Sequence, residues 1–147
     1  MTDADLVRAA RALTLAARAL ERAVADKDLT LAQYRVLALI AGGDERSTLL
    51  ADRLAVAKPT ITAVVDGLVE RGFIERSTVD GDRRSIRLAL TKPGTKALRD
   101  ADAQMAATLE RIFGHAEHRD ELIAALADLD GALTARMLQR REERAQA

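Results

Sequence analysis

Residues 49–90 constrain the fold more than any other part of this chain. They read LLADRLAVAKPTITAVVDGLVERGFIERSTVDGDRRSIRLAL: two helical apolar patterns meet near residues 55–57, and a strand–turn–strand pattern follows. Six apolar side chains can close on one another only if the two helices cross at a steep angle. They are Leu50, Leu54, Ile61, Val64, Val65 and Leu68. This order of elements predicts a helix-turn-helix with a β-hairpin behind it; an ordinary αα-hairpin is the alternative for the helical part.

The second of these helices has one apolar and one polar face. It is predicted to begin near Ala57 or Lys58 and to end at Gly72, with a proline in its first turn, where a missing N–H does no harm. Its polar face leaves the N-terminal turns free to lie in a DNA major groove. We therefore expect four residues to face bases or phosphates there. They are Lys58, Pro59, Thr60 and Thr62.

The strand–turn–strand pattern carries a basic tip. The first strand begins near Phe73, an Asp-Gly turn signal occupies residues 80–81, and residues 85–90 alternate as a half-buried return strand. Arg83 and Arg84 follow the turn, so the hairpin is expected to bring two guanidinium groups to a minor groove or to phosphates. Which of the two arginines enters the groove is left open by the sequence.

Further helical patterns flank this stretch. Capping residues and apolar periodicity predict helices over residues 6–24, 31–41, 92–113 and 119–144, and a short helix capped by Ser47 or Thr48. The first and last helices carry apolar stripes that a domain of this size cannot cover alone, which predicts a homodimer. The expected fold class is therefore mainly α with a small β-hairpin wing.

The composition agrees with this fold and narrows the class of protein. A chain of 147 residues is expected to form a single domain, and 2% aromatic residues among 48% hydrophobic ones favour helices over a large sheet. The absence of cysteine excludes disulfides, thiolate metal sites and thiol redox switches. No apolar run approaches the ~20 residues of a membrane span, and no secretion signal is present, so a cytoplasmic protein without a membrane partner is expected.

Positive charge is concentrated around the helix-turn-helix although the formal net charge is zero. Residues 46–99 hold 11 Lys and Arg against 6 Asp and Glu, a difference of +5. The whole chain holds 23 basic and 23 acidic residues, so the rest of the chain has a charge difference of −5. A basic segment of this kind is expected where a chain binds the DNA backbone.

Other functions have less support in the residues. The chain has no phosphate-binding glycine loop, no nucleophile elbow and no carboxylate pair on a predicted pocket, so neither an enzyme activity nor a cofactor is expected. His115 and His118 lie close to acidic residues, but a solvated connector accounts for them better than a metal site. The main alternative is a dimeric helical adaptor without DNA function, which leaves Arg83 and Arg84 unexplained.

Taken together, these motifs resemble the MarR family of bacterial winged-helix regulators over nearly the whole chain. The resemblance rests on Leu29-Thr30 with Gln33 and Leu37, Leu50-Ala51 with Leu54, Thr60-Ile61-Thr62 with Val65-Asp66, LVERGFI at 68–74, Asp82-Arg83-Arg84, and Leu90-Thr91 with Gly94. It implies one domain, with a winged helix-turn-helix over residues 29–91 and a dimerisation region formed by residues 1–28 and 92–147. It also implies a homodimer on a pseudo-palindromic DNA duplex, with recognition helices about 34 Å apart, and repression as the usual mode. In this pattern Ala57 stands where a capping Ser is common.

The resemblance also implies a small-molecule effector, bound where the first, second and fifth helices meet beside the dimer interface. Without cysteine the chain cannot respond to oxidants as the thiol-based branch of the family does. The effector is expected to be an acid, for instance an aromatic one, held by apolar walls and a guanidinium group. The candidate contacts are Arg11, Leu13, Arg18, Tyr34, Leu37 and Met105. The alternative is that Tyr34 is a core residue and that Arg11 and Arg18 belong to a solvated face.

Overall fold

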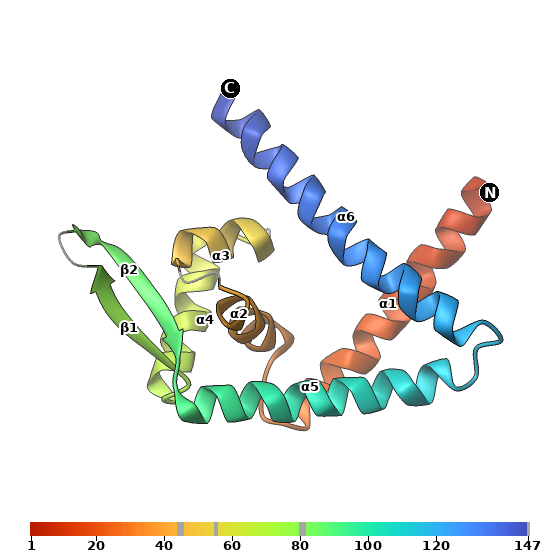
Figure 1. Cartoon of the computed structure of the whole chain (residues 1–147), viewed down its shortest axis with the longest axis horizontal. Helices are drawn as coiled ribbons and strands as arrows, with labels where there is room; N and C mark the ends of the chain where they lie inside the picture. The colour runs from red at the N-terminus through yellow and green to blue at the C-terminus, as the bar shows by residue number, and fades with distance from the viewer. Residues whose placement is uncertain (44–45, 55, 80–81, 147) are drawn as a thin grey trace.

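The computed structural model of the chain describes residues 1–43, 46–54, 56–79 and 82–146, and at residues 47–49, 79, 82–85, 141 and 144–145 it describes the backbone alone. Its elements in chain order are α1 (Asp3–Ala25), α2 (Leu31–Ala41), α3 (Ser47–Leu54), α4 (Lys58–Glu70), β1 (Ile74–Val79), β2 (Asp82–Leu90), α5 (Lys92–Phe113) and α6 (Arg119–Gln146) (Figure 1). The two strands pair antiparallel. The expected fold class, mainly α with one β-hairpin, is confirmed.

Most element bounds lie within three residues of the predicted ones, and two of the differences change the interpretation. α3 begins at Ser47 itself, so Ser47 is its first helical residue and not the cap before it. β2 begins at Asp82 rather than at Ser85, because an irregularity after Thr78 lets Val79 pair with Asp82 and prolongs the ladder. The predicted turn at residues 80–81 lies outside the described residues.

Polar side chains close the helix ends as their sequence positions predict. Thr30 Oγ1 accepts from the backbone N–H of Gln33 at 3.1 Å, and Gln33 Oε1 accepts from that of Thr30 at 3.0 Å, which is a reciprocal capping box. Thr91 Oγ1 accepts from the N–H of Gly94 at 3.0 Å and donates to the carbonyl of Gly72 at 2.6 Å. The start of α5 is thereby tied to the end of α4.

The core of the molecule surrounds α2. Val36 and Leu37 of this helix are fully buried, and α2 contacts α1, α3, α4, α5 and β2. Fully buried side chains from the surrounding elements complete this core: Val24, Leu50, Val65, Leu68, Ile74 and Leu88. Residues of α2–α4 and of the β-hairpin thus form one compact unit, here called the winged-helix lobe.

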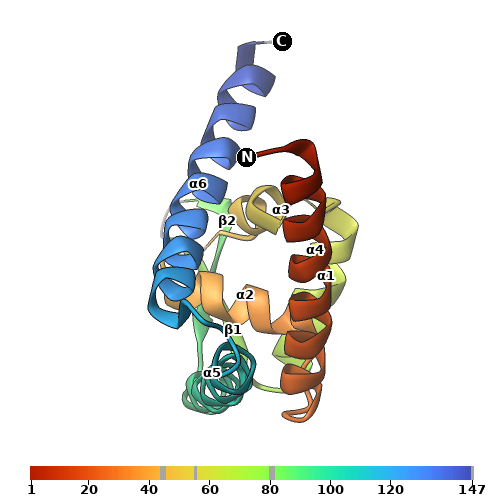
Figure 2. The same ribbon diagram turned by 90° about the vertical axis from the view of Figure 1, so that its right-hand side faces the viewer.

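Two long helices extend from this lobe. α6 starts at the C-terminal end of α5 and runs back above it, whereas α1 rises from near the middle of α5 and crosses α6 in this view (Figure 1); seen from the side, the two helices stand apart above α5 (Figure 2). In α1 the only buried described residues are Ala23 and Val24 at its C-terminal end, and none of the described residues of α6 is buried. We call α1 and α6 the helical arms.

Candidate nucleic-acid interface

The first turns of α4 form an exposed polar surface. Ile61, Val65 and Leu68 point into the core, so the opposite face of the helix is left open. The four predicted DNA contacts all lie on exposed positions at this end: Lys58, Pro59, Thr60 and Thr62. The structure therefore brings these four residues together on one accessible surface.

The backbone at the start of α4 has no side-chain cap. Ala57 occupies the N-cap position, and no side-chain hydrogen bond closes it. Pro59 lies in the first turn and contributes no N–H. Thr62 Oγ1 donates to the carbonyl of Lys58 at 3.0 Å. The positive end of the helix dipole is consequently presented at the exposed end of α4, where an anion such as phosphate is favoured.

A tight turn fixes the direction of the hairpin relative to α4. Gly72 has a φ of +70°, its N–H donates to the carbonyl of Val69 at 2.9 Å, and the N–H of Phe73 donates to that of Leu68 at 2.9 Å. These two bonds form a Schellman motif, for which glycine is the favoured residue. The chain passes directly from α4 into β1, so the hairpin stands beside α4.

Gly94 makes this junction close-packed. A Cβ atom added at Gly94 would lie 1.9 Å from the carbonyl oxygen of Phe73, so no larger residue fits without moving backbone. The N–H of Thr91 donates to the same oxygen at 3.1 Å. The base of the wing is thus fixed between α4 and α5.

Two arginine contacts that the sequence analysis did not foresee hold the lobe together. The Arg76 guanidinium on β1 forms an ion pair with Asp66 on α4. Arg71 donates to the carbonyl of Asp28 at 2.6 Å, and its guanidinium lies 4.6 Å from the centroid of the Phe73 ring. Asp66 therefore holds the wing against the recognition helix.

The wing also contacts the residue ahead of α3. Arg87 of β2 forms an isolated antiparallel bridge with Arg46. The backbones of Arg83 and Arg84 belong to β2, whereas their side chains lie outside the described residues. Their predicted contact with DNA stays a prediction.

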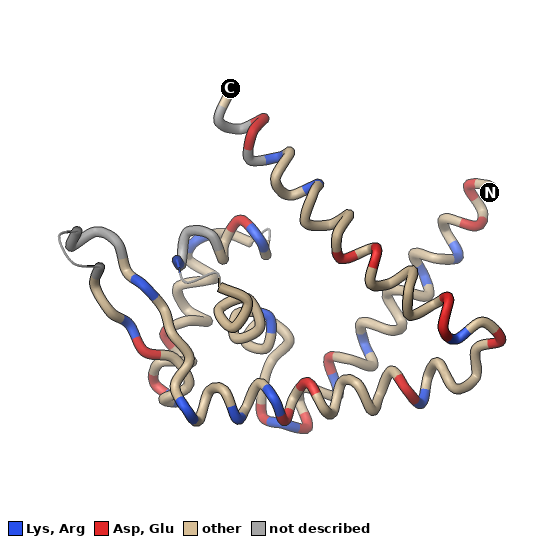
Figure 3. Tube along the Cα trace, in the orientation of Figure 1, with Lys and Arg blue, Asp and Glu red and all other residues tan. Residues whose placement is uncertain are grey.

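Basic residues cluster on the lobe. Lys and Arg positions recur along the hairpin, around α3 and at the start of α5, with single acidic positions among them (Figure 3). Among the described residues of the lobe and of the turn after α4, the exposed basic side chains are Arg35, Arg46, Arg53, Lys58, Arg71, Arg76 and Arg87. The concentration of positive charge expected from the sequence is thus placed on the lobe that carries the recognition helix.

A MarR family model matches residues 27–85, which include α2, α3, α4 and the described start of β2. The chain is 37% identical over 76 residues to YpoP of Bacillus subtilis, an HTH-type transcriptional regulator that is itself uncharacterised. That match covers 51% of this chain and 54% of YpoP, so the chain matches about half the length of this curated relative.

Solved structures extend the similarity to nearly the whole chain. The repressor CouR bound to a 23-mer DNA duplex is 30% identical, with a TM-score of 0.73, over 85% of this chain and 89% of CouR. The chain belongs to the MarR family. CouR of Rhodococcus jostii RHA1 bound to p-coumaroyl-CoA matches with 26% identity and a TM-score of 0.68, over 82% of this chain and 84% of that one. Apo MarR of E. coli, at 21% identity, shares the fold with a TM-score of 0.72 over 90% of this chain and 98% of that one.

In this MarR-family chain, the residues predicted to bind an effector are distributed over α1, α2 and α5. Arg11 and Leu13 are exposed on α1, and Arg18 pairs there with Glu21 at 2.9 Å. Leu37 has no exposed surface, and its role as a pocket wall stays a prediction. Met105 packs against the core from α5. Helices α1, α2 and α5 do contact one another as expected, but core side chains fill their junction.

Tyr34 is the one predicted effector contact that lines a described cavity. The cavity has a volume of about 250 Å³ and lies between α2, α3 and α6, not at the junction of α1, α2 and α5. The phenol donates to Asp102 Oδ1 of α5 at 2.8 Å. Burial, and then the bond to Asp102, raise the pKa of Tyr34 to about 12. The phenol is therefore a protonated donor at neutral pH that connects α2 to α5.

The two histidines lie at the connection between α5 and α6. His115 and His118 are exposed in and after the turn between α5 and α6, and His118 Nδ1 lies 3.8 Å from Glu121 Oε2. Among the residues that the structure describes, no group of three or more His, Cys, Asp or Glu side chains could hold a metal ion. In the same part of the chain, no helix has the length and apolar character needed to cross a bilayer.

Proposed function

We propose that this chain is a sequence-specific regulator of transcription that binds double-stranded DNA as a homodimer and acts as a repressor. The observation that carries the proposal is the exposed N-terminal surface of α4, beside a hairpin held in place by the Asp66–Arg76 ion pair. A helix can enter a major groove only if its reading face is free and the elements beside it follow the backbone. Family membership and the DNA-bound structure of CouR agree with this assignment.

The proposed contacts divide by role. Lys58, Pro59, Thr60 and Thr62 at the start of α4 would face base edges or phosphates, with the helix dipole favouring phosphate. Arg83 and Arg84, close to the wing tip, would reach the minor groove or its phosphates, because a guanidinium group is attracted to the negative potential of a narrow groove.

The homodimer follows from the exposed apolar side chains of the helical arms. Leu15 is 74% exposed, Leu133 is 59% exposed and Leu138 is 50% exposed, although all three are large hydrophobic residues. Exposed apolar stripes of this kind mark an interface. We assign dimerisation to residues 1–28 and 92–147, so that the two recognition helices would meet successive major grooves of a pseudo-palindromic site, about 34 Å apart.

The regulation proposed for this dimer is release from DNA by a small acidic ligand. CouR is named as a repressor and has been solved with p-coumaroyl-CoA and with DNA, which supports a ligand-released repressor and leaves the chemistry of this chain's ligand to experiment. A ligand can lower DNA affinity only by binding better to a conformation that fits DNA less well. A tenfold loss of affinity requires about 1.4 kcal/mol of such preference.

Gel shifts on the DNA upstream of the chain's own gene test the proposal. The double variant Arg83→Ala/Arg84→Ala is expected to bind at least about tenfold more weakly at moderate salt, because two cationic contacts per subunit are lost. Arg8→Ala/Lys27→Ala, which removes two exposed charges outside the lobe and outside residues 46–99, is the matched control. No specific shift with any upstream fragment, together with a stable dimer in sedimentation, would favour a helical adaptor without DNA function.

A further inference from the structure

The side chain of Arg71 connects the end of α4 to three other parts of the molecule. Arg71 is the C-cap residue of α4, and its Nη1 donates to the backbone carbonyl of Asp28, 43 positions earlier, at 2.6 Å. The same nitrogen lies 3.5 Å from Gln33 Oε1, the atom that accepts from the Thr30 N–H at the start of α2. The guanidinium also lies over the Phe73 ring. One side chain therefore contacts the end of α1, the start of α2 and the base of the wing.

The hydrogen bond from Arg71 reaches a backbone position that residues other than glycine rarely adopt. Asp28 has a φ of +56°, and among the described residues it is the only one besides glycine with a positive φ. Its N–H donates to the carbonyl of Ala25 at 3.0 Å. The N–H of Leu29 donates to that of Val24 at 3.1 Å, so α1 ends in a Schellman motif, in which glycine is the usual residue. The bond to Arg71 therefore stabilises this turn where an aspartate replaces the glycine.

This bond joins the proposed dimerisation region to the helix proposed to read DNA. Asp28 is the last residue of the region 1–28 assigned to dimerisation, and Thr30 caps the first helix of the lobe. α1 packs against α2 and α5, whereas α4 packs against α2, α3 and β1. The hydrogen bond from Arg71 is thus a direct connection between the C-terminal ends of α4 and α1.

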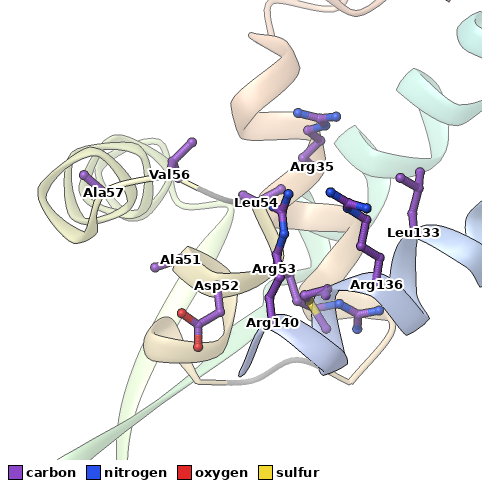
Figure 4. Close-up of a pocket in the computed structure, with 11 residues that line it drawn as sticks. Arg35, Ala51, Asp52, Arg53, Leu54, Val56, Ala57, Leu133, Arg136 and Arg140 are labelled. Atoms are coloured by element: carbon purple, nitrogen blue, oxygen red, sulfur yellow. The ribbon is translucent and has the colours of Figure 1, made fainter. Parts of the chain in front are cut away.

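The other end of α4 is separated from the second arm. A cavity of about 850 Å³ lies between the residues leading into α4 and helix α6 (Figure 4). Val56 and Ala57 line it on one side, and Leu133 and Arg136 on the other. Lys58 lies roughly 20 Å from Arg71 along the helix, so a rotation of roughly 10° at Arg71 moves the reading residues by roughly 3.5 Å. That displacement equals about one base pair of DNA.

We propose that Arg71 is a positioning residue for DNA binding: it fixes the direction of α4 relative to α1, and thereby the half-site spacing that the homodimer accepts. The effect on DNA rests on the function proposed above, whereas the effect on the direction of α4 does not. A guanidinium group suits this role because its planar face stacks on an aromatic ring while its edge donates hydrogen bonds in fixed directions. A lysine ammonium has no planar face and no fixed donor directions.

The distance between two spin labels tests the direction of α4 without DNA. The chain has no cysteine, so Arg8→Cys and Ala63→Cys, at exposed positions of α1 and α4, provide two unique labelling sites. A large excess of unlabelled chain ensures that a dimer contains at most one labelled copy, so the measured distance lies within one chain. Residue 8 lies roughly 30 Å from Asp28 along α1, and a rotation of roughly 10° at the junction moves it by roughly 5 Å.

Variants of Arg71 are compared by pulsed electron resonance on this labelled chain. Arg71→Ala is expected to widen or shift the distance distribution by at least about 5 Å. Arg71→Lys should lie closer to Arg71→Ala than to the parent chain, because the charge alone does not hold the geometry. Arg22→Ala removes an exposed arginine in the last turn of α1 and is the matched control, which should leave the distribution unchanged.

Gel shifts test the effect on half-site spacing. They use a DNA fragment that the parent chain binds and versions with one base pair inserted or removed between the half-sites, which moves them by about 3.4 Å and rotates them by roughly 34°. The parent is expected to lose at least about tenfold in affinity with either change. Arg71→Ala should bind the original fragment several-fold more weakly and distinguish the three spacings by less than about threefold. Loss of a phosphate contact would instead weaken binding to all three equally and lower its salt dependence.

Four results would overturn the proposal: Arg71→Ala leaves the label distances unchanged, Arg71→Ala keeps the spacing preference of the parent, Arg71→Lys restores both properties in full, or Arg71→Ala weakens all spacings equally with a smaller salt dependence. The last result would assign Arg71 to a DNA phosphate. If Arg71→Ala does not fold, Arg71→Lys provides the same comparison. Altered label distances in a chain whose parent binds no DNA would contradict the proposed function alone, whereas specific DNA binding with unaltered distances would contradict only the role of Arg71.

Discussion

The winged-helix lobe and the helical arms use similar apolar residues and bury them to very different extents. α2 has only 11 residues, yet Val36, Leu37 and Ile40 are buried, whereas none of the described residues of the 28-residue α6 is buried. A periodic apolar stripe predicts that a helix packs against something, but not whether the partner belongs to the same chain. The lobe is therefore stable through contacts within one chain, and on our proposal the arms depend on a second copy.

The largest expected effect tests this comparison in the lobe. Leu37→Ala is expected to lower the free energy of unfolding by about 2–5 kcal/mol, because it leaves a cavity at a fully buried position. Leu133→Ala in α6 is its matched control, since Leu133 is 59% exposed within one chain. Urea denaturation at several protein concentrations distinguishes the effects of Leu37→Ala and Leu133→Ala on stability.

The cost of Leu37→Ala should be the same at every protein concentration. Leu133→Ala should act chiefly by changing how stability depends on concentration, because the interface it weakens joins two chains. Equal, concentration-independent costs for both variants would contradict the division into lobe and arms.

A pair of glycines gives the next largest effect. Gly94→Ala is expected to destabilise the chain by about 1–3 kcal/mol, because the new Cβ would meet the Phe73 carbonyl oxygen at 1.9 Å. Gly131→Ala in α6 meets nothing within 4 Å and should instead raise stability by up to about 1 kcal/mol through helix propensity. The midpoint temperatures of thermal unfolding should therefore shift in opposite directions for the two variants. A gain of stability in Gly94→Ala would show that Gly94 and Phe73 pack less closely than described.

A smaller effect is expected from the phenol that joins α2 to α5. Tyr34→Phe removes the hydrogen bond to Asp102 and should lower stability by about 1 kcal/mol at neutral pH. Because the pKa of Tyr34 is raised from 10.0 to about 12, the folded state holds this proton more tightly than the unfolded state. The contribution is complete below pH 10 and is lost as the pH rises through about 12. Denaturation between pH 8 and 12 should show a steeper decline for the parent than for Tyr34→Phe.

The smallest effect on stability, and a diagnostic effect on DNA binding, is expected at Asp66. Asp66→Asn breaks an ion pair whose side chains are 38% and 48% exposed, so the stability should change by less than about 1 kcal/mol. Removing a negative charge favours DNA binding by itself, whereas releasing the wing opposes it. We expect several-fold weaker binding in gel shifts.

Glu70→Gln is the matched control for this variant. Glu70 is an exposed carboxylate at the end of the same helix, and no side-chain contact to it is found within the described residues. Its neutralisation should leave the affinity unchanged or slightly raise it. If Asp66→Asn instead raises the affinity as Glu70→Gln does, the ion pair has no part in placing the wing.

The local sequence was sufficient to predict most of the secondary structure and the family. Thr30 with Gln33, Gly72 and Thr91 act within a few residues of the helix ends they define, and such short-range hydrogen bonds depend little on the rest of the fold. The exposed position of Lys58, Thr60 and Thr62 followed from the apolar stripe on the other side of α4. These features are encoded in periodicity and caps, which a single chain displays directly.

The pairing of side chains was decided by the tertiary structure alone. Tyr34 meets Asp102 across 68 positions, and Asp66 meets Arg76 because the turn at Gly72 folds the wing back beside α4. The same applies to the cavity at Tyr34, whose walls come from α2, α3 and α6. A charged residue on an exposed helix face has the same periodic signature whether it meets solvent, a partner or a ligand. Only the relative position of whole elements, set by the packing of the core, distinguishes these outcomes.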